Sequence, residues 1–142
     1  MPGGSCSALE ELPARARAIV SDSRRAVLAT VDSHRRPHAV PVCWAEKEGR
    51  FVVAIDDKPK SSRRLQRVRN IETNPDVTLL FDHYEDDWKR IGWVMVRARA
   101  SLAPPGTASE ELASRYQQYS TSPPTGEVIV ALPQRIVWWT FE

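Results

Sequence analysis

Basic residues gather in one short stretch between two apolar runs, and they are the side chains with the clearest chemical potential. At about 100° per residue they share one arc of a helix expected from Ser61 or Ser62 to Thr73, beside an apolar arc that would face the core. The basic arc consists of Lys60, Arg63, Arg64 and Arg67. A helix N-terminus adds unpaired N–H groups, so the pattern is typical of an anion site. A solvated, Arg-rich helix face is the alternative, and the pattern by itself leaves both open.

Other familiar chemistries have little support in the sequence. The three histidines show no compact metal-ligand spacing, so no metal site is expected. The chain contains no G-x-S-x-G, no Walker loop and no Gly-rich dinucleotide fingerprint. Cys43, between Val42 and Trp44, is predicted to be a buried structural thiol. The acidic cluster from Asp82 to Asp87 could supply a general acid, although a solvated loop is the commoner explanation.

Length and composition predict one ordinary globular domain covering residues 1–142. The net charge of +2 is too small to indicate nucleic acid as the main partner. No segment is apolar enough to span a membrane or to form a signal-peptide core, so we expect a cytoplasmic protein with no membrane partner. Two cysteines, Cys6 and Cys43, do not indicate a disulfide framework. Residues 1–7 are predicted to be disordered.

The expected elements define a mainly β protein with two to three peripheral helices. Helices are expected near residues 12–20, 61–73 and 108–119. Strands are expected at 24–31, 36–45, 51–55, 77–84 and 91–102, and at 127–132 and 135–141 on either side of Pro133. Short strands at hairpin spacing, with one helical crossover among the first four, favour an antiparallel barrel over a parallel sheet.

The strand at 36–45 contains two prolines, Pro37 and Pro41. Proline cannot donate to a ladder, so this strand should lie at an edge of the sheet, be irregular, or be arranged to leave some N–H positions free. Its remaining N–H and C=O groups could then bind a cofactor that lies along the strand.

Several motifs resemble one family. They are LATV at 28–31, RPHAVPV at 36–42, DDKPK at 56–60, the run from Arg63 to Trp88 that ends in DHYEDDW, and GEVIVALPQRIVWW at 126–139. The sequence resembles the pyridoxamine 5'-phosphate oxidase-like split-barrel flavoproteins, and within them the actinobacterial oxidoreductases that depend on the deazaflavin coenzyme F420. The resemblance covers nearly the whole chain from about Arg24. It implies a six-stranded antiparallel split β-barrel of the FMN-binding type.

The resemblance also implies a site. Members are homodimers that hold the cofactor in a groove between subunits. The ring would lie on the second and third strands, here on His38, Ala39, Val40, Pro41, Val42, Ala54, Ile55 and Asp56. The phosphate would bind Lys58, Lys60 and Arg64 in the basic loop, where Pro59 also belongs to the cofactor site. The partner subunit would contribute an aromatic side chain, with Trp88, Trp93 and Trp139 as the candidates. Arg63, Arg67 and Arg69 are hypothesised to meet the acidic tail of F420.

The implied activity is hydride transfer from reduced F420 to a small-molecule acceptor, with no catalytic side chain assigned. One alternative is an FMN oxidase or reductase of the same fold. Another is a non-catalytic protein that binds F420, flavin or haem. No determinant specific for pyridoxamine is recognisable, so vitamin B6 oxidation is the least expected activity.

Overall fold

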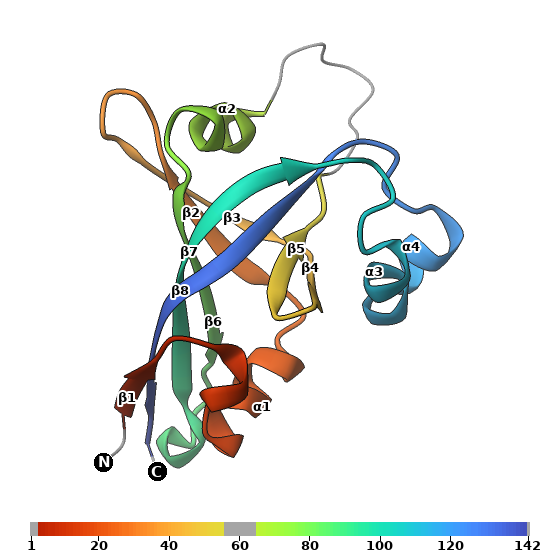
Figure 1. The fold of residues 1–142 in the computed structure, drawn as a ribbon. Helices are drawn as coiled ribbons and strands as arrows, with labels where there is room; N and C mark the ends of the chain where they lie inside the picture. The colour runs from red at the N-terminus through yellow and green to blue at the C-terminus, as the bar shows by residue number, and fades with distance from the viewer. Residues whose placement is uncertain (1–2, 56–64, 142) are drawn as a thin grey trace.

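A computed structural model describes residues 3–55 and 65–141, and within them the chain forms one curled antiparallel sheet with peripheral helices (Figure 1). The strands are β1 (Gly3–Cys6), β2 (Ala26–Val31), β3 (Pro37–Val42), β4 (Trp44–Lys47), β5 (Arg50–Val53), β6 (Asp76–His83), β7 (Gly92–Ala103) and β8 (Val128–Thr140). Their order is β3-β2-β6-β7-β8-β5-β4, with β1 paired to β8. The predicted fold class is therefore confirmed.

Three differences turn the seven predicted strand ranges into the eight strands of the structure. The N-terminus is not disordered from residue 3 onward, because Gly3–Cys6 pairs with the last strand. The strand expected at 36–45 is two strands that separate at Cys43. β3 pairs with β2 at one end of the strand order, and β4 pairs with β5 at the other end. The chain therefore changes direction at Cys43, which a single straight strand would not do.

The last strand is continuous, contrary to the expected interruption at Pro133. Ala98 pairs with Pro133 and Arg97 pairs with Arg135, so Gln134 has no partner on β7. This one-residue register shift is a β-bulge, which accommodates a proline inside a strand. A single β8 results, paired to β7 from Val128 to Thr140.

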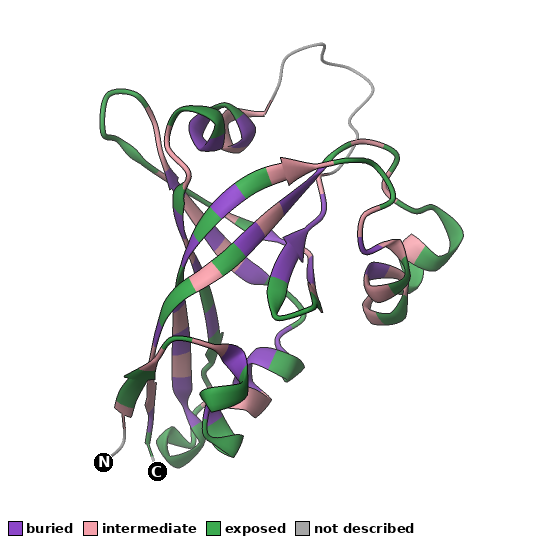
Figure 2. Cartoon of the chain, viewed as in Figure 1, coloured by how far each residue is buried: buried purple, intermediate pink, exposed green. Residues whose placement is uncertain are grey.

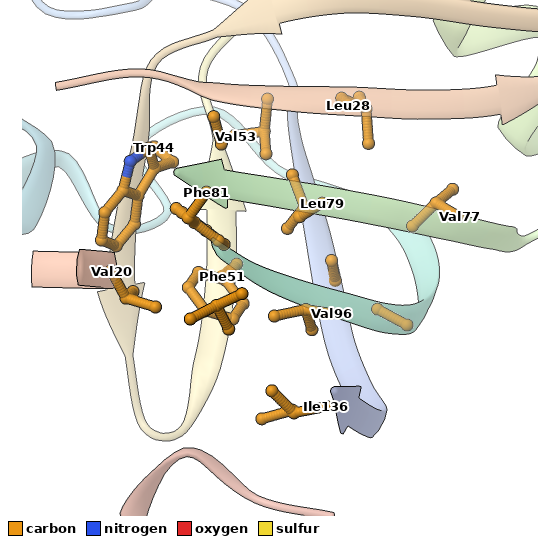
Figure 3. Close-up of a cluster of buried hydrophobic side chains, with 14 of the residues drawn as sticks. Val20, Leu28, Trp44, Phe51, Val53, Val77, Leu79, Phe81, Val96 and Ile136 are labelled. Atoms are coloured by element: carbon orange, nitrogen blue, oxygen red, sulfur yellow. The ribbon is translucent and has the colours of Figure 1, made fainter. Parts of the chain in front are cut away.

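The core lies inside the curl of the sheet (Figure 3). Trp44, Phe51 and Phe81 pack there with ring centroids 5.0 to 5.5 Å apart. Along β7 buried and less buried residues alternate, and Val94 and Val96 are buried whereas Arg97 is exposed. Figure 2 shows this alternation of buried and exposed residues along the strands. In β2 only every second residue is buried, although the strand is nearly all apolar, because the other face of the sheet points outward.

The helices lie around the sheet. They are α1 (Ala14–Asp22), α2 (Gln66–Thr73), α3 (Ser109–Arg115) and α4 (Gln117–Thr121), with 3-10 turns η1 (Leu9–Glu11) and η2 (Trp88–Arg90). α2 ends at Thr73 as predicted but begins at Gln66, later than expected. The helix expected at 108–119 is two helices, because Tyr116 takes an extended φ of −129° between them.

The hairpin between β4 and β5 turns at a glycine. Glu48 and Gly49 form its two-residue turn with φ of 53° and 77°, and Lys47 pairs with Arg50. Positive φ at both turn positions matches the right-handed twist of the strands, and glycine adopts it without strain. Among the helices in the described part of the chain, none is both long and apolar enough to cross a membrane.

Candidate functional site

The β3 strand forms an open edge of the sheet, which is one of the arrangements that its prolines allow. β3 pairs only with β2 among the described strands. At the turn, the Asp32 N–H donates to the Arg36 carbonyl at 3.0 Å. Since hydrogen-bonded pairs recur every second residue in an antiparallel ladder, the residues bonded to β2 are the even-numbered ones. They are His38, Val40 and Val42.

The odd-numbered residues Pro37, Ala39 and Pro41 therefore direct their backbone groups away from β2. Their side chains are exposed. Proline has no N–H, so this edge offers three carbonyls and the single N–H of Ala39. A planar ring with both imide N–H and carbonyl groups matches such an edge. The edge thus presents one backbone donor between backbone acceptors.

Besides the open backbone edge of β3, His38 is a second feature that is typical of a binding site. Its Nδ1 atom is buried and has no hydrogen-bond partner in the structure. Buried polar atoms without a partner are uncommon and costly, so a ligand that pairs with this nitrogen would be stabilised. The neighbouring Val40 side chain packs against the core, which fixes the strand beneath His38.

The structure also brings the end of β5 to the end of β3. The Ala54 N–H donates to the Cys43 carbonyl at 3.2 Å, next to Val42. Ile55 is half-buried, whereas the side chains of Val42 and Ala54 are buried, so those two residues can meet a ligand only through their backbone. Two segments predicted to share the cofactor are thus adjacent.

Other predicted site residues are not joined to this edge. Asp56, Lys58, Pro59, Lys60 and Arg64 lie outside the described residues. Trp88 is 70% exposed and lies in η2. η2 follows the end of β6 that is remote from His38, so Trp88 of the same chain does not reach the β3 edge. Its role stays a prediction.

A cavity of about 640 Å³ opens where β3 and β5 end, between Cys43, Ile55 and α4. The Trp44 N–H donates to the Tyr116 hydroxyl at 3.0 Å, and that hydroxyl donates to the Arg24 carbonyl at 2.9 Å. These bonds hold α3 and α4 beside the β4–β5 hairpin (Figure 1). Cys43 is half-buried in the cavity wall, which corrects its assignment as a buried thiol.

The walls of this cavity are aromatic and polar. Tyr116 and Tyr119 lie edge to face with ring centroids 5.7 Å apart, and the Arg24 guanidinium lies 4.9 Å from the Tyr116 ring. The sequence placed the two tyrosines near one helix face but gave no sign that they meet Arg24. That contact joins residues 92 positions apart, so only the tertiary structure could show it.

In the acidic cluster at the far end of β6, Glu85 is held ionised. His83 Nε2 lies 2.6 Å from the Glu85 carboxylate, and this hydrogen bond lowers the pKa of Glu85. Arg90, 3.5 Å from Glu85, adds to the lowering of this pKa. A carboxyl group held ionised has no proton to donate. Within the described residues, no group of three His, Cys, Asp or Glu side chains is arranged to hold a metal.

Comparison with known proteins identifies the family. The family model described as pyridoxamine 5'-phosphate oxidase matches residues 12–139. No curated protein matches the chain. The chain therefore belongs to the pyridoxamine 5'-phosphate oxidase-like family, as the resemblance of its sequence motifs had indicated.

Solved structures share the fold at low identity. The haem storage protein HutZ from Vibrio cholerae is 18% identical with a TM-score of 0.66, over 83% of this chain and 86% of its own. An FAD-binding protein from Mesorhizobium loti is 17% identical with a TM-score of 0.62, over 96% and 95%. A haem-binding protein from Mycobacterium smegmatis is 18% identical with a TM-score of 0.67, over 87% and 52%. The fold thus occurs in both flavin- and haem-binding proteins.

Proposed function

We propose that this protein is an oxidoreductase that uses reduced coenzyme F420 for hydride transfer to a small-molecule acceptor. The open edge of β3 carries the proposal. Its alternating prolines leave one N–H, at Ala39, between carbonyls, and His38 adds a buried nitrogen without a partner. This arrangement suits the imide edge of a deazaflavin.

Within this proposal each segment has a separate task. Ala39 and the carbonyls of Pro37 and Pro41 bind and orient the ring, and His38 donates to it or accepts from it. The cations Lys58, Lys60 and Arg64 are proposed to bind the phosphate. When bound, the reduced deazaflavin supplies the hydride. No side chain needs to form a covalent intermediate. The protein only has to orient the ring and exclude water from it.

The acceptor is proposed to bind in the 640 Å³ cavity, which adjoins the proposed ring site at Cys43 and Ile55. Tyr116 and Tyr119 present aromatic surface and Arg24 presents a positive charge. These groups favour a flat, unsaturated acceptor, and their packing excludes water from one face of it.

We also propose that a second copy of the chain completes the groove. An apolar row crosses the outward face of five neighbouring strands at one register position. It consists of Pro41, Val27, Leu80, Met95 and Val137. Leu80 is 38% exposed, and so continuous a row is typical of an interface. Because the row begins at Pro41, a subunit that covers it would reach the β3 edge.

A paired titration tests the cofactor. Purified protein is titrated with F420, FMN and haemin, with ligand fluorescence or absorbance as the signal. We expect F420 to bind most tightly. In Ala39→Pro the edge N–H is lost, and F420 affinity should fall about tenfold, the effect of one hydrogen bond. Ala39→Ser keeps the N–H and serves as the matched control.

The outcomes separate the alternatives. Preference for FMN would replace F420 with a flavin, and preference for haemin would make the protein a haem-binding protein. Equal F420 affinity in Ala39→Pro and Ala39→Ser would refute the role of the β3 edge. Hydride transfer is then tested by the loss of reduced F420 with flat unsaturated acceptors such as menadione.

A further inference from the structure

The segment of α3 and α4, which forms one wall of the acceptor cavity, contacts the sheet through little apolar surface (Figure 1). Two small clusters of buried side chains, separate from the main core, join it to the sheet. They consist of Ala45, Ala54 and Leu112 and of Val52, Ala108 and Val128. Three of these six residues are alanines, whose methyl groups bury little apolar area. Polar contacts therefore matter for the position of this wall.

Arg115, the last residue of α3, joins that helix to the end of α1 and to the core. Its guanidinium lies over the ring of the buried Trp44, 3.8 Å from the ring centroid. The two terminal nitrogens of Arg115 donate to the carbonyls of Ser23 and Ser21 at 2.7 and 3.3 Å. These carbonyls belong to the last turn of α1 and the residue after it, where the negative end of the helix dipole favours a cation. The Ser23 carbonyl also accepts the indole N–H of Trp44 at 3.2 Å, so one planar side chain completes a closed set of contacts.

Arg115 is not among the described residues that line the acceptor cavity, but it contacts or adjoins two that are. Its backbone carbonyl accepts a hydrogen bond from the Arg24 guanidinium. Tyr116 is the next residue along the chain, and its hydroxyl is held between the Trp44 N–H and the Arg24 carbonyl. Tyr116 also has the extended φ at which α3 ends and α4 begins. The position of Arg115 therefore affects the direction of α4 and the placement of both Tyr116 and Arg24.

The shape of the Arg115 side chain matters here as well as its charge. A guanidinium is planar, so it can lie on an indole ring while its N–H groups reach two carbonyls. An ammonium group is a point charge on a flexible stem and cannot make both kinds of contact in the same way. Arg115→Lys keeps the charge but loses this geometry, so the two contributions can be separated by experiment.

We propose that Arg115 is a positioning residue of the acceptor cavity, which holds Tyr116 and Arg24 in place for the acceptor and touches neither acceptor nor cofactor. This inference rests on the proposed function. The cofactor is proposed to bind along β3, whereas the side chain of Arg115 contacts α1 and Trp44 and its carbonyl contacts Arg24. Loss of the Arg115 side chain should therefore weaken acceptor binding and leave F420 binding unchanged.

The first measurement follows the cavity wall directly and needs no activity. Cys43 lies half-buried in the cavity wall, and Cys6→Ser leaves it as the single thiol of the chain. In that background, the reaction of Cys43 with the thiol reagent DTNB is compared with and without Arg115→Gln. We expect Cys43 to react about tenfold faster in Arg115→Gln, because the wall opens locally more often. Arg25→Gln removes the same charge from an exposed neighbour of Arg24 and should react at the wild-type rate.

The second measurement compares two ligands, F420 and menadione, the latter as a flat unsaturated acceptor. Binding of menadione is followed by quenching of tryptophan fluorescence, and binding of F420 by the fluorescence of the cofactor. In Arg115→Gln the Kd of menadione should rise about tenfold, while the Kd of F420 stays within about twofold of the wild-type value. Arg115→Lys should fall between the wild type and Arg115→Gln, and it is the second variant if Arg115→Gln does not fold.

A further variant controls for a general loss of stability. Ile136→Val removes one buried methylene group from the main core, away from α3 and α4. It should lower the melting temperature and leave both the Cys43 rate and the Kd of menadione unchanged.

The outcomes separate this inference from the proposed function. If the wild-type protein binds F420 but the Arg115 variants keep the wild-type Kd of menadione, the proposed function stands and this inference is wrong, whatever the Cys43 rate. The inference is also wrong if Ile136→Val changes the Cys43 rate and the Kd of menadione as much as Arg115→Gln does, since Arg115 would then contribute only stability. If the wild-type protein binds no F420, the proposed function fails, and the assignment of Arg115 to an acceptor cavity fails with it.

Discussion

At the level of single side chains, His38 has the most informative surroundings. Its Nδ1 is buried without a partner, whereas His34 in the turn of the same hairpin is exposed. We expect His38→Ala to weaken cofactor binding about tenfold, because one hydrogen bond to the ligand is lost. His34→Ala should change the affinity for F420 less than twofold. Fluorescence titration of both variants measures this, and equal losses would remove His38 from the site.

Asp32 gives a prediction about pH. Its folded pKa lies below the ordinary value of 3.8, because backbone N–H groups and Arg36 favour the carboxylate. A depressed folded pKa stabilises the native state above the unfolded pKa, and this stabilisation is lost as the pH falls through the folded pKa. The melting temperature of Asp32→Asn should therefore lie below that of the wild type at pH 7. The gap should close below about pH 3.8. A gap that stays constant to pH 2.5 would contradict this.

At the level of elements, a buried polar contact ties α2 to the sheet. Asn70 and Thr30 are both buried, and the amide donates to the hydroxyl at 2.9 Å. Asn70→Ala leaves the hydroxyl without its partner, so we expect a loss of about 1–3 kcal/mol in the free energy of unfolding. Denaturant unfolding measures it.

A double-mutant cycle tests whether the contact itself is responsible. Thr30→Val removes the other partner. The double variant Asn70→Ala/Thr30→Val should lose less free energy of unfolding than the sum of the losses in the two single variants. Simple additivity would mean that Asn70 stabilises α2 through packing rather than through Thr30.

At the level of the whole molecule, the outward apolar row predicts a dimer. Leu80 lies at the centre of the row, between Val27 and Met95. Leu80→Arg places a charge there and should raise the dimer dissociation constant at least a hundredfold, which sedimentation velocity can measure. Ser114→Arg adds the same side chain to exposed α3 and should have no effect. A wild-type protein that sediments as a monomer would contradict the prediction.

Much of the fold could be predicted from local patterns. The prolines of β3 were compatible with an edge strand, Gly49 is a residue that favours a turn, and apolar residues alternate along β7. These features depend on backbone geometry and on residues near one another in sequence. The corner at Cys43 and the bulge at Gln134 could not be predicted, because both arise from pairing with distant strands.

The same division applies to the site. The sequence by itself determined the family resemblance, the basic stretch and the strand with few N–H groups. Each of these features depends only on residues that follow one another in the chain. Only the tertiary structure decided that Tyr116 meets Arg24, that His38 Nδ1 lacks a partner, and that Arg115 lies over the Trp44 ring. Those facts depend on burial and on contacts between residues far apart in the chain, and burial exists only once the sheet has curled.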